Sequence, residues 1–260
     1  MTNRIYAIRY GHLDRLSHHN FLGGDEHAQR MPLDYFVWAI RSGEHTIVVD
    51  TGFDAAAAAK RGRTLLRPVA QGLAEIGIDV QHVRDVVITH MHYDHAGNVP
   101  LFPRARFHVQ DAEMAYCTGR AMTHAHLAAP FDAENVVDMV RRTFEGRVDF
   151  HAGDTQLHPG VTLHHLPGHT LGLQAVRVQT DRGAVVLASD AIHFWANLER
   201  GTPYPIVADV VGYLEALRKL RELAPSVDHI IPGHDPGVLR RFPAEPGTRD
   251  IVRLDLAPIE

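Results

Sequence analysis

Residues 86–98 place four candidate metal ligands directly after a short apolar run. The segment reads Val-Val-Ile-Thr-His-Met-His-Tyr-Asp-His-Ala-Gly-Asn. Imidazole and carboxylate groups are ligands of zinc, iron and manganese. His90 and His92 are two positions apart, so on an extended backbone they point to the same side. Asp94 and His95 are adjacent, so the chain must turn before both can reach a metal, and the spacing favours two metal ions over one.

Three further segments have a similar design, in which an apolar run expected to form a strand leads to a possible ligand. Their ligands are His169, Asp190 and His234. Gly168 and Gly233 precede the two histidines, and a glycine lets the backbone pass close to a crowded site. One His-x-His pair is weak evidence, whereas four such segments in this order are hard to obtain by chance. Because the chain has 20 histidines, membership of a pattern selects the candidates.

Strands and helices are interspersed along the 260 residues, without a repeat and without a Pro/Ser-rich linker. Aromatic and branched residues at 34–41 and 45–50 predict a hairpin. Apolar residues near the 3.6-residue period predict a helix over 64–76. Residues 11–32 have no period and are expected to form a long loop. The pattern predicts sheets packed together with helices outside them, in a single domain spanning 1–260.

Composition excludes several classes of function. The net charge is −5 and no block of Lys and Arg stands out, so a nucleic-acid partner is not expected. No apolar run approaches the roughly 18 residues of a membrane span, so no membrane association is expected. The N-terminal residues lack the pattern of a signal peptide, and a cytoplasmic location is the expectation. The single cysteine, Cys117, excludes an internal disulfide framework and is interpreted as a packed helical thiol.

With these motifs, the sequence resembles the metallo-β-lactamase superfamily, and within it the branch of N-acyl homoserine lactonases (quorum-quenching lactonases), over about residues 34–236. The resemblance implies an α/β (α+β) fold, a four-layer αββα sandwich of two mixed sheets with the metals at one edge. It implies a centre of two divalent metal ions, with Zn²⁺ expected and iron, manganese or cobalt left open. Asp50 matches an aspartate that lies beside the ligands and orients an imidazole. One ion is expected on His90, His92 and His169, the other on Asp94, His95 and His234, with Asp190 bridging both.

The resemblance further implies a metal-dependent hydrolase that acts on carboxylic ester bonds and opens a lactone ring. The substrate is expected to be an N-acyl homoserine lactone or a related lactone. A metal-bridging hydroxide would attack the carbonyl carbon, and Asp94 would pass its proton to the leaving alkoxide. Glyoxalase-type thioesterases share all seven ligands, so another ester or thioester hydrolase stays open. A metal-dependent signal-binding protein without catalysis is a further alternative, although it has no need of a bridging aspartate.

The chain departs from the lactonase pattern after Asp190. The branch has a tyrosine three residues later, where this chain has His193. A neutral imidazole can donate one hydrogen bond, so His193 is predicted to act catalytically on the substrate carbonyl, with simple packing as the alternative. The long N-terminal loop leaves a homodimer open. The predicted substrate pocket, with core positions as the alternative for its last three members, consists of Phe21, Phe194, Trp195 and Tyr204.

Overall fold

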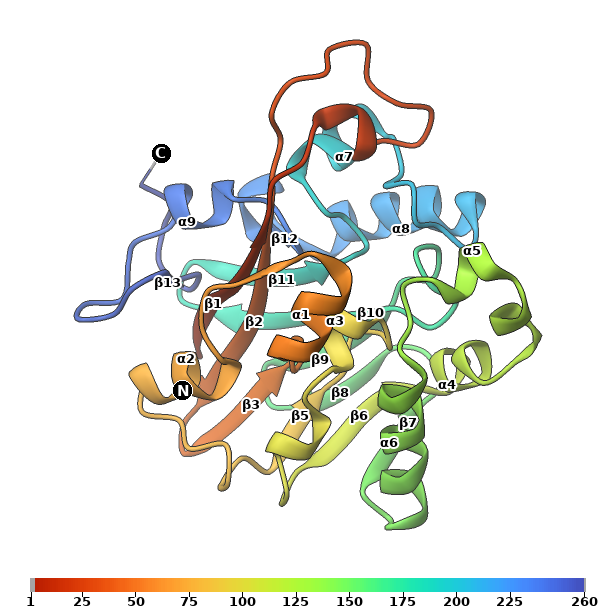
Figure 1. Cartoon of the computed structure of the whole chain (residues 1–260). Helices are drawn as coiled ribbons and strands as arrows, with labels where there is room; N and C mark the ends of the chain where they lie inside the picture. Colours follow the sequence, from red (N-terminus) through yellow and green to blue (C-terminus); the bar gives the residue numbers. More distant parts are fainter. Residues whose placement is uncertain (1–2, 260) are drawn as a thin grey trace.

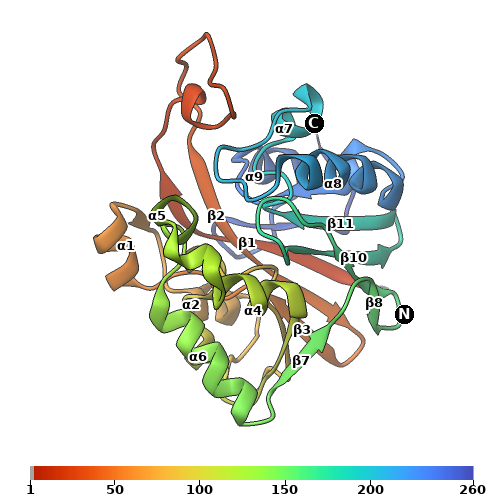
Figure 2. The same cartoon turned by 90° about the vertical axis from the view of Figure 1, so that its right-hand side faces the viewer.

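The computed structural model describes residues 3–259, and within them two mixed sheets lie face to face (Figures 1 and 2). The first sheet has the strand order β13-β1-β2-β3-β5-β6-β7, with β4 paired to β1 outside that path. Its β3, β5, β6 and β7 run parallel, whereas β1, β2, β3 and β13 pair antiparallel. The strands are β1 (Arg4–Leu13), β2 (Leu33–Ser42), β3 (His45–Val49), β4 (Thr64–Leu65), β5 (Asp85–Val87), β6 (Arg106–Gln110), β7 (Val148–His151) and β13 (Ile251–Arg253).

The second sheet has the order β12-β11-β10-β9-β8. Only β11 and β12 pair in parallel among its strands in residues 3–259. Its strands are β8 (Thr155–His158), β9 (Val161–His165), β10 (Gln174–Thr180), β11 (Gly183–Ser189) and β12 (Ile230–Pro232).

Helices cover the outer face of each sheet, which completes the expected four-layer αββα arrangement (Figure 2). In Figures 1 and 2, α1 to α6 lie on the side of the first sheet and α7 to α9 on the side of the second. Short 3₁₀ turns occupy Ser17–His19, Val99–Leu101, Arg120–Thr123 and Val227–His229. The helices are α1 (Ala55–Arg61), α2 (Val69–Glu75), α3 (Tyr93–Ala96), α4 (Asp111–Cys117), α5 (Ala125–Ala128), α6 (Ala133–Phe144), α7 (Trp195–Arg200), α8 (Val210–Leu223) and α9 (Gly237–Arg241).

Alternation along the strands divides the apolar side chains between separate cores. In β11, Val185 and Leu187 pack between the sheets, whereas Val186 packs toward α8 with Leu220. Successive side chains of a strand point to opposite faces, so a strand buried on both faces is apolar throughout. At about 25 cal/mol per Å² of buried apolar surface, this double burial is the main stabilisation of the sandwich.

Two local expectations were wrong. Residues 64–76 do not form one helix, because Thr64 and Leu65 form β4 and α2 begins only after Pro68. Proline cannot donate a backbone hydrogen bond, so it is accepted before a helix but not inside one. The long loop also begins later than residue 11, because β1 continues through Leu13, which pairs with Leu33 of β2. The connection between β1 and β2 extends away from the body of the molecule (Figure 1).

Candidate metal centre

The seven predicted ligands meet at one edge of the sandwich, where strands of both sheets end. His90, His92, Asp94 and His95 follow β5 of the first sheet, across the loop and into α3. The other three ligands follow β9, β11 and β12 of the second sheet. All seven side chains are buried, and the most accessible, Asp94, is only 8% exposed. The structure therefore brings the whole predicted set into one pocket shielded from water.

The atoms of the seven predicted ligands fall into two separate groups, and His193 forms a third group with Asp190 and His234. In each group, all ligand atoms lie within 4.8 Å of one another. Such convergence of imidazole nitrogens and carboxylate oxygens is the donor set that divalent transition metals bind. The first group is His90, His92, His169 and Asp190, and the second is Asp94, His95 and His234.

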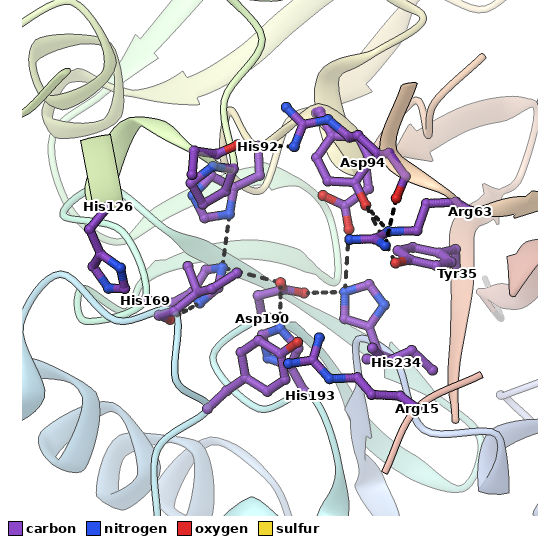
Figure 3. Close-up of a pocket in the computed structure, with 17 residues that line it drawn as sticks. Arg15, Tyr35, Arg63, His92, Asp94, His126, His169, Asp190, His193 and His234 are labelled. Atoms are coloured by element: carbon purple, nitrogen blue, oxygen red, sulfur yellow. Dashed lines mark hydrogen bonds and ion pairs between the residues drawn. The ribbon is translucent and has the colours of Figure 1, made fainter. Parts of the chain in front are cut away.

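Asp190 faces both groups, one with each carboxylate oxygen (Figure 3). Its Oδ2 lies 3.2 Å from Nε2 of His169 and 3.8 Å from Nε2 of His90. Its Oδ1 lies 3.0 Å from Nε2 of His234 and 3.4 Å from Nε2 of His95. This is the arrangement required of a carboxylate that bridges two cations.

Hydrogen bonds on the outer side of the rings fix which nitrogen faces the cluster. Nδ1 of His169 donates to the carbonyl oxygen of Ile206 at 2.7 Å, and Nδ1 of His234 donates to that of Asp34 at 2.9 Å. A carbonyl oxygen can only accept, so in a neutral ring the hydrogen is on Nδ1 and the Nε2 lone pair points inward. A metal ligand needs that lone pair, and such outer partners are typical of metal-binding histidines.

Asp50 orients His95 as expected. Its Oδ2 lies 2.7 Å from Nδ1 of His95, and its Oδ1 accepts a hydrogen bond from the backbone nitrogen of Thr89 at 2.7 Å. Asp50 has a φ of 63°, a region that costs free energy for a residue with a side chain. The strained backbone and the two anchored oxygens hold the carboxylate behind the ring of His95.

The pKa values of the histidines in the cluster are shifted in opposite directions. Burial and neighbouring imidazoles hold the pKa of His90 and of His92 well below the ordinary value. These rings are therefore neutral at pH 7, as metal ligands must be. Burial also lowers the pKa of His95, but the facing carboxylates of Asp190 and Asp94 outweigh it and raise that pKa well above the ordinary value. The carboxylates thus attract positive charge to the centre of the cluster.

Buried polar atoms without partners provide a test of whether a metal fits. Nε2 of His95 and Oδ1 of Asp190 are both buried, and neither has a hydrogen-bond partner within residues 3–259. Buried polar groups in folded proteins are nearly always paired, and an unpaired one costs about 1–3 kcal/mol. Both atoms are electron-pair donors aimed into the cluster. The donor set therefore fits a pair of divalent cations, which would satisfy both atoms.

Gly168 and Gly233 allow the close backbone approach that the sequence predicts for them. A Cβ at Gly233 would lie 2.6 Å from Oδ1 of Asp190, and a Cβ at Gly168 would lie 2.4 Å from the backbone of Tyr213 in α8. Real Cβ atoms do not approach other atoms so closely. Any side chain at position 233 would therefore displace the carboxylate of Asp190.

Glu113 links the two halves of the centre, a role that sequence reasoning missed. This residue of α4 is fully buried. Its Oε1 accepts from the backbone nitrogen of Met91 at 2.7 Å, between two ligands of the first sheet. Its Oε2 accepts from Oγ1 of Thr170 at 2.6 Å and from the backbone nitrogen of Gly172 at 3.1 Å. This one carboxylate therefore fixes the distance between the loop that contains His92 and the loop that contains His169.

His193 lies inside the cluster, with its Nε2 3.1 Å from Oδ2 of Asp190. Its other ring nitrogen, Nδ1, is buried and has no hydrogen-bond partner within residues 3–259. Its ring also lies against Tyr204. His193 is therefore placed beside the reacting centre, where a catalytic role is geometrically open to it.

A cavity of about 250 Å³ opens over the cluster. Of the four residues predicted for a substrate pocket, Tyr204 lines it, whereas the other three are not among its lining residues. Phe21 is buried beneath Arg200, Phe194 packs with Leu33, and the indole nitrogen of Trp195 donates to the carbonyl of Ile230. Sequence patterns gave no indication of several residues that do line the cavity, namely Arg15, Tyr35, Arg61, Arg63, Tyr93 and His126.

A family model of the metallo-beta-lactamase superfamily matches residues 30–234. The chain belongs to this superfamily. An N-acyl homoserine lactonase from Bacillus sp is 26% identical over 221 residues, which cover 78% of this chain and 82% of the relative. The acyl-coenzyme A thioesterase MBLAC2 from Homo sapiens is 27% identical over 223 residues, which cover 76% of this chain and 72% of the relative.

A solved structure of an N-acyl homoserine lactone hydrolase, with its product N-hexanoyl-L-homoserine bound at the catalytic metal centre, has the same fold as this superfamily member. The TM-score is 0.75 at 22% identity, and the match covers 92% of this chain and 95% of that one. The expected sandwich is therefore confirmed. The expectation of a hydrolytic enzyme is also confirmed, because the sequence relatives are lactonases and thioesterases. Within residues 3–259, no helix combines the length and apolar character needed to cross a bilayer.

Proposed function

We propose that this chain is a hydrolase that opens a lactone ring, or cleaves a related carboxylic ester, at a centre of two Zn²⁺ ions. The position of Asp190 carries the proposal, because its two oxygens face separate ligand groups. A mononuclear site would leave one of these groups without a function. The resemblance to N-acyl homoserine lactonases supports the choice of a lactone.

In this proposal, His90, His92 and His169 hold one ion, Asp94, His95 and His234 hold the other, and Asp190 holds both. Divalent ions held there would acidify a bound water molecule and polarise a substrate carbonyl.

Asp94 and His193 have the remaining chemical roles. Asp94 lines the cavity, and its Oδ2 lies 3.7 Å from Nε2 of His95 and of His234. We assign this carboxylate as the acceptor of the water proton, which it returns to the leaving alkoxide. We assign the imidazole of His193 as a hydrogen-bond donor to the substrate carbonyl oxygen. Because burial lowers the pKa of His193 well below the ordinary value, the ring donates a hydrogen bond as a neutral group.

A thioester substrate is the second candidate, because one relative is an acyl-coenzyme A thioesterase. The same residues would serve either reaction, since both begin with attack on a carbonyl carbon. A protein that binds a signal molecule without turnover is disfavoured by the placement of Asp190. Turnover of N-acyl homoserine lactones, simple lactones, aryl esters and acyl-coenzyme A thioesters by the zinc-loaded protein separates these candidates.

Two substitutions test the centre itself. Asp190→Asn and His169→Ala should each remove bound zinc, measured by elemental analysis, together with hydrolysis. The half-buried Asp138 of α6 and the exposed His82 lie outside the cluster and provide controls, and Asp138→Asn and His82→Ala should leave both quantities unchanged. Full hydrolysis by metal-free protein would disprove the proposed mechanism.

A further inference from the structure

Three guanidinium groups line the cavity over the metal centre, on Arg15, Arg61 and Arg63. No carboxylate of residues 3–259 forms an ion pair with any of them, although such pairs are frequent on other arginines of the chain. The carboxylates that line the same cavity are those of Asp94 and Asp190, which face the ligand histidines. The wall of the cavity therefore has three guanidinium groups that form no ion pair with a carboxylate of the described residues.

The guanidinium of Arg61 forms hydrogen bonds with backbone carbonyl groups of the cavity wall. Its Nη1 donates to the carbonyl oxygen of Ala129, and its Nη2 donates to that of Phe131, both at 2.9 Å. Its guanidinium carbon lies 3.9 Å from the ring centroid of Tyr93. Both terminal nitrogens of Arg61 are therefore used within the wall, although its Nε is also buried without a hydrogen-bond partner among residues 3–259.

Arg63 retains a free donor. Its Nε donates to the hydroxyl of Tyr93 at 3.0 Å, and its Nη1 donates to the carbonyl oxygen of Arg61 at 2.8 Å. Its Nη2 forms no hydrogen bond within the described part of the chain. Tyr93 also links this arginine to the centre, because the Tyr93 hydroxyl lies 3.4 Å from that of Tyr35, whose ring packs on His234.

Arg15 also retains a free donor, on a different element. Its Nη2 donates to the carbonyl oxygen of His19, and its guanidinium carbon lies 5.2 Å from the ring centroid of Tyr204. Its Nε is buried without a hydrogen-bond partner among residues 3–259. In Figure 3, Arg63 and Arg15 lie above and below His234, whereas His126 lies beyond His169 on the other side.

The rest of the lining does not suit a long alkyl chain. Its aliphatic members are Leu33, Ala129, Pro130 and Ile206, and the other lining residues are charged, imidazole-bearing or phenolic. Guanidinium groups match the planar oxygens of carboxylates and phosphates, and they bind them with two parallel hydrogen bonds. The guanidinium groups of Arg15 and Arg63 are half-buried and form no ion pair with a carboxylate of residues 3–259, so the cavity favours an occupant that supplies the opposite charge.

We infer that the substrate of this enzyme has an anionic group, a carboxylate or a phosphate, next to the ester that is hydrolysed, and that Arg63 and Arg15 bind it. The inference rests on the proposed ester-hydrolysing centre and narrows its substrate class. The preferred substrate is then a compact acidic lactone or ester rather than a neutral lactone with a long acyl chain.

The test compares γ-butyrolactones that differ at one ring carbon, which bears a carboxylate, a phosphonate or a neutral carboxamide. Zinc-loaded wild type should show at least a tenfold higher kcat/KM for one of the two acids than for the carboxamide. The better acid identifies the source of the charge. In Arg63→Gln and in Arg15→Gln, the ratio of acid to carboxamide should fall toward one. Arg63→Lys should retain part of the preference.

Arg218 provides a matched control, because it is exposed on α8 and already paired with Glu215 and Glu222. Arg218→Gln should leave the ratio as in wild type. Equal kcat/KM for the acids and the carboxamide, or a preference that survives both arginine-to-glutamine variants, overturns the inference while leaving the proposed hydrolase intact.

Binding of tetrahydrofuran-3-carboxylate, which has no ester bond, separates failure of the inference from failure of the proposed function. Calorimetry on the zinc-loaded proteins should show binding to wild type and to Arg218→Gln, and at least tenfold weaker binding to Arg63→Gln. This result without turnover of any lactone would support the anion site and count against the hydrolase. Binding that is equal in wild type and Arg63→Gln overturns the anion site.

Discussion

The ring of Tyr204 stacks flat on the ring of His193, with centroids 3.5 Å apart and an angle of 8° between the planes. His193 in turn reaches Asp190 through Nε2. The stack therefore fixes the orientation of an imidazole beside the bridging carboxylate. The two residues are eleven positions apart along the chain, so only the tertiary structure relates them.

Removing the aromatic ring that stacks on His193 should lower kcat without lowering the zinc content of the protein. Tyr204→Ala frees the ring of His193, and loss of positioning of this kind costs about a hundredfold in kcat. Tyr204→Phe preserves the aromatic face and should retain most of the activity. Steady-state kinetics and zinc content measured on both variants check the prediction. An equal loss in Tyr204→Phe would show that the hydroxyl, and not the stack, is what matters.

Chelation should destabilise the protein. A ligand at a thousand times its dissociation constant stabilises a fold by about 4 kcal/mol. For a chain of this size, about 3 °C is lost per kcal/mol, so removal of the metals should lower the Tm by about 10 °C. Differential scanning fluorimetry with and without EDTA provides the measurement. Zinc should restore the Tm, and Asp190→Asn should show no response to the chelator.

Substitution of Glu113 should weaken metal binding from a distance. Glu113→Gln keeps the size of the side chain but presents an amide nitrogen to backbone donors. Loss of a buried group that orients ligands typically lowers metal affinity by about 10- to 100-fold. Competition with a fluorescent zinc chelator measures the affinity. The exposed Glu222→Gln should match wild type, and an unchanged affinity in Glu113→Gln would remove its role as a link between the two loops.

Cys117 should be inert in the folded protein. Its thiol is buried, and burial together with the charge of Glu113 raises the pKa of Cys117 well above the ordinary value. The thiolate is the reactive form, so a thiol reagent at pH 8 should label the native protein very slowly. One equivalent should react at once in guanidinium chloride. Rapid labelling of native protein would contradict the packed position.

The ligand set could be predicted because its information is local. Asp190 directly follows β11 and His90 lies three residues after the end of β5, and the residues that must converge lie within short motifs. The same is true of the glycines before His169 and His234, whose side-chain-free positions the structure requires. A hairpin and helices interspersed with strands were sufficient to predict packed sheets with helices outside them, and the family resemblance implied that the sheets are two.

The walls of the cavity could not be predicted, because they depend on contacts between distant loops. Trp195 is aromatic and follows the site in sequence, yet it packs between the sheets. Phe21 turns inward within the connection between β1 and β2. Arg15 and Arg63 look like ordinary surface cations in the sequence. Only the folded chain shows that they face the cavity and form no ion pair with a carboxylate of residues 3–259.

Because the candidate ligands are divided between the two sheets, the lifetime of the protein should depend on the supply of metal. His90 and His95 follow a strand of one sheet, and Asp190 and His234 follow strands of the other, so the centre exists only while the sheets stay docked. Each bound ion therefore opposes separation of the sheets. In metal-poor surroundings, hydrogen exchange should accelerate first along the inner strands, and proteases should gain access there. Degradation would then remove metal-free molecules selectively, so that the surviving population remains metal-loaded.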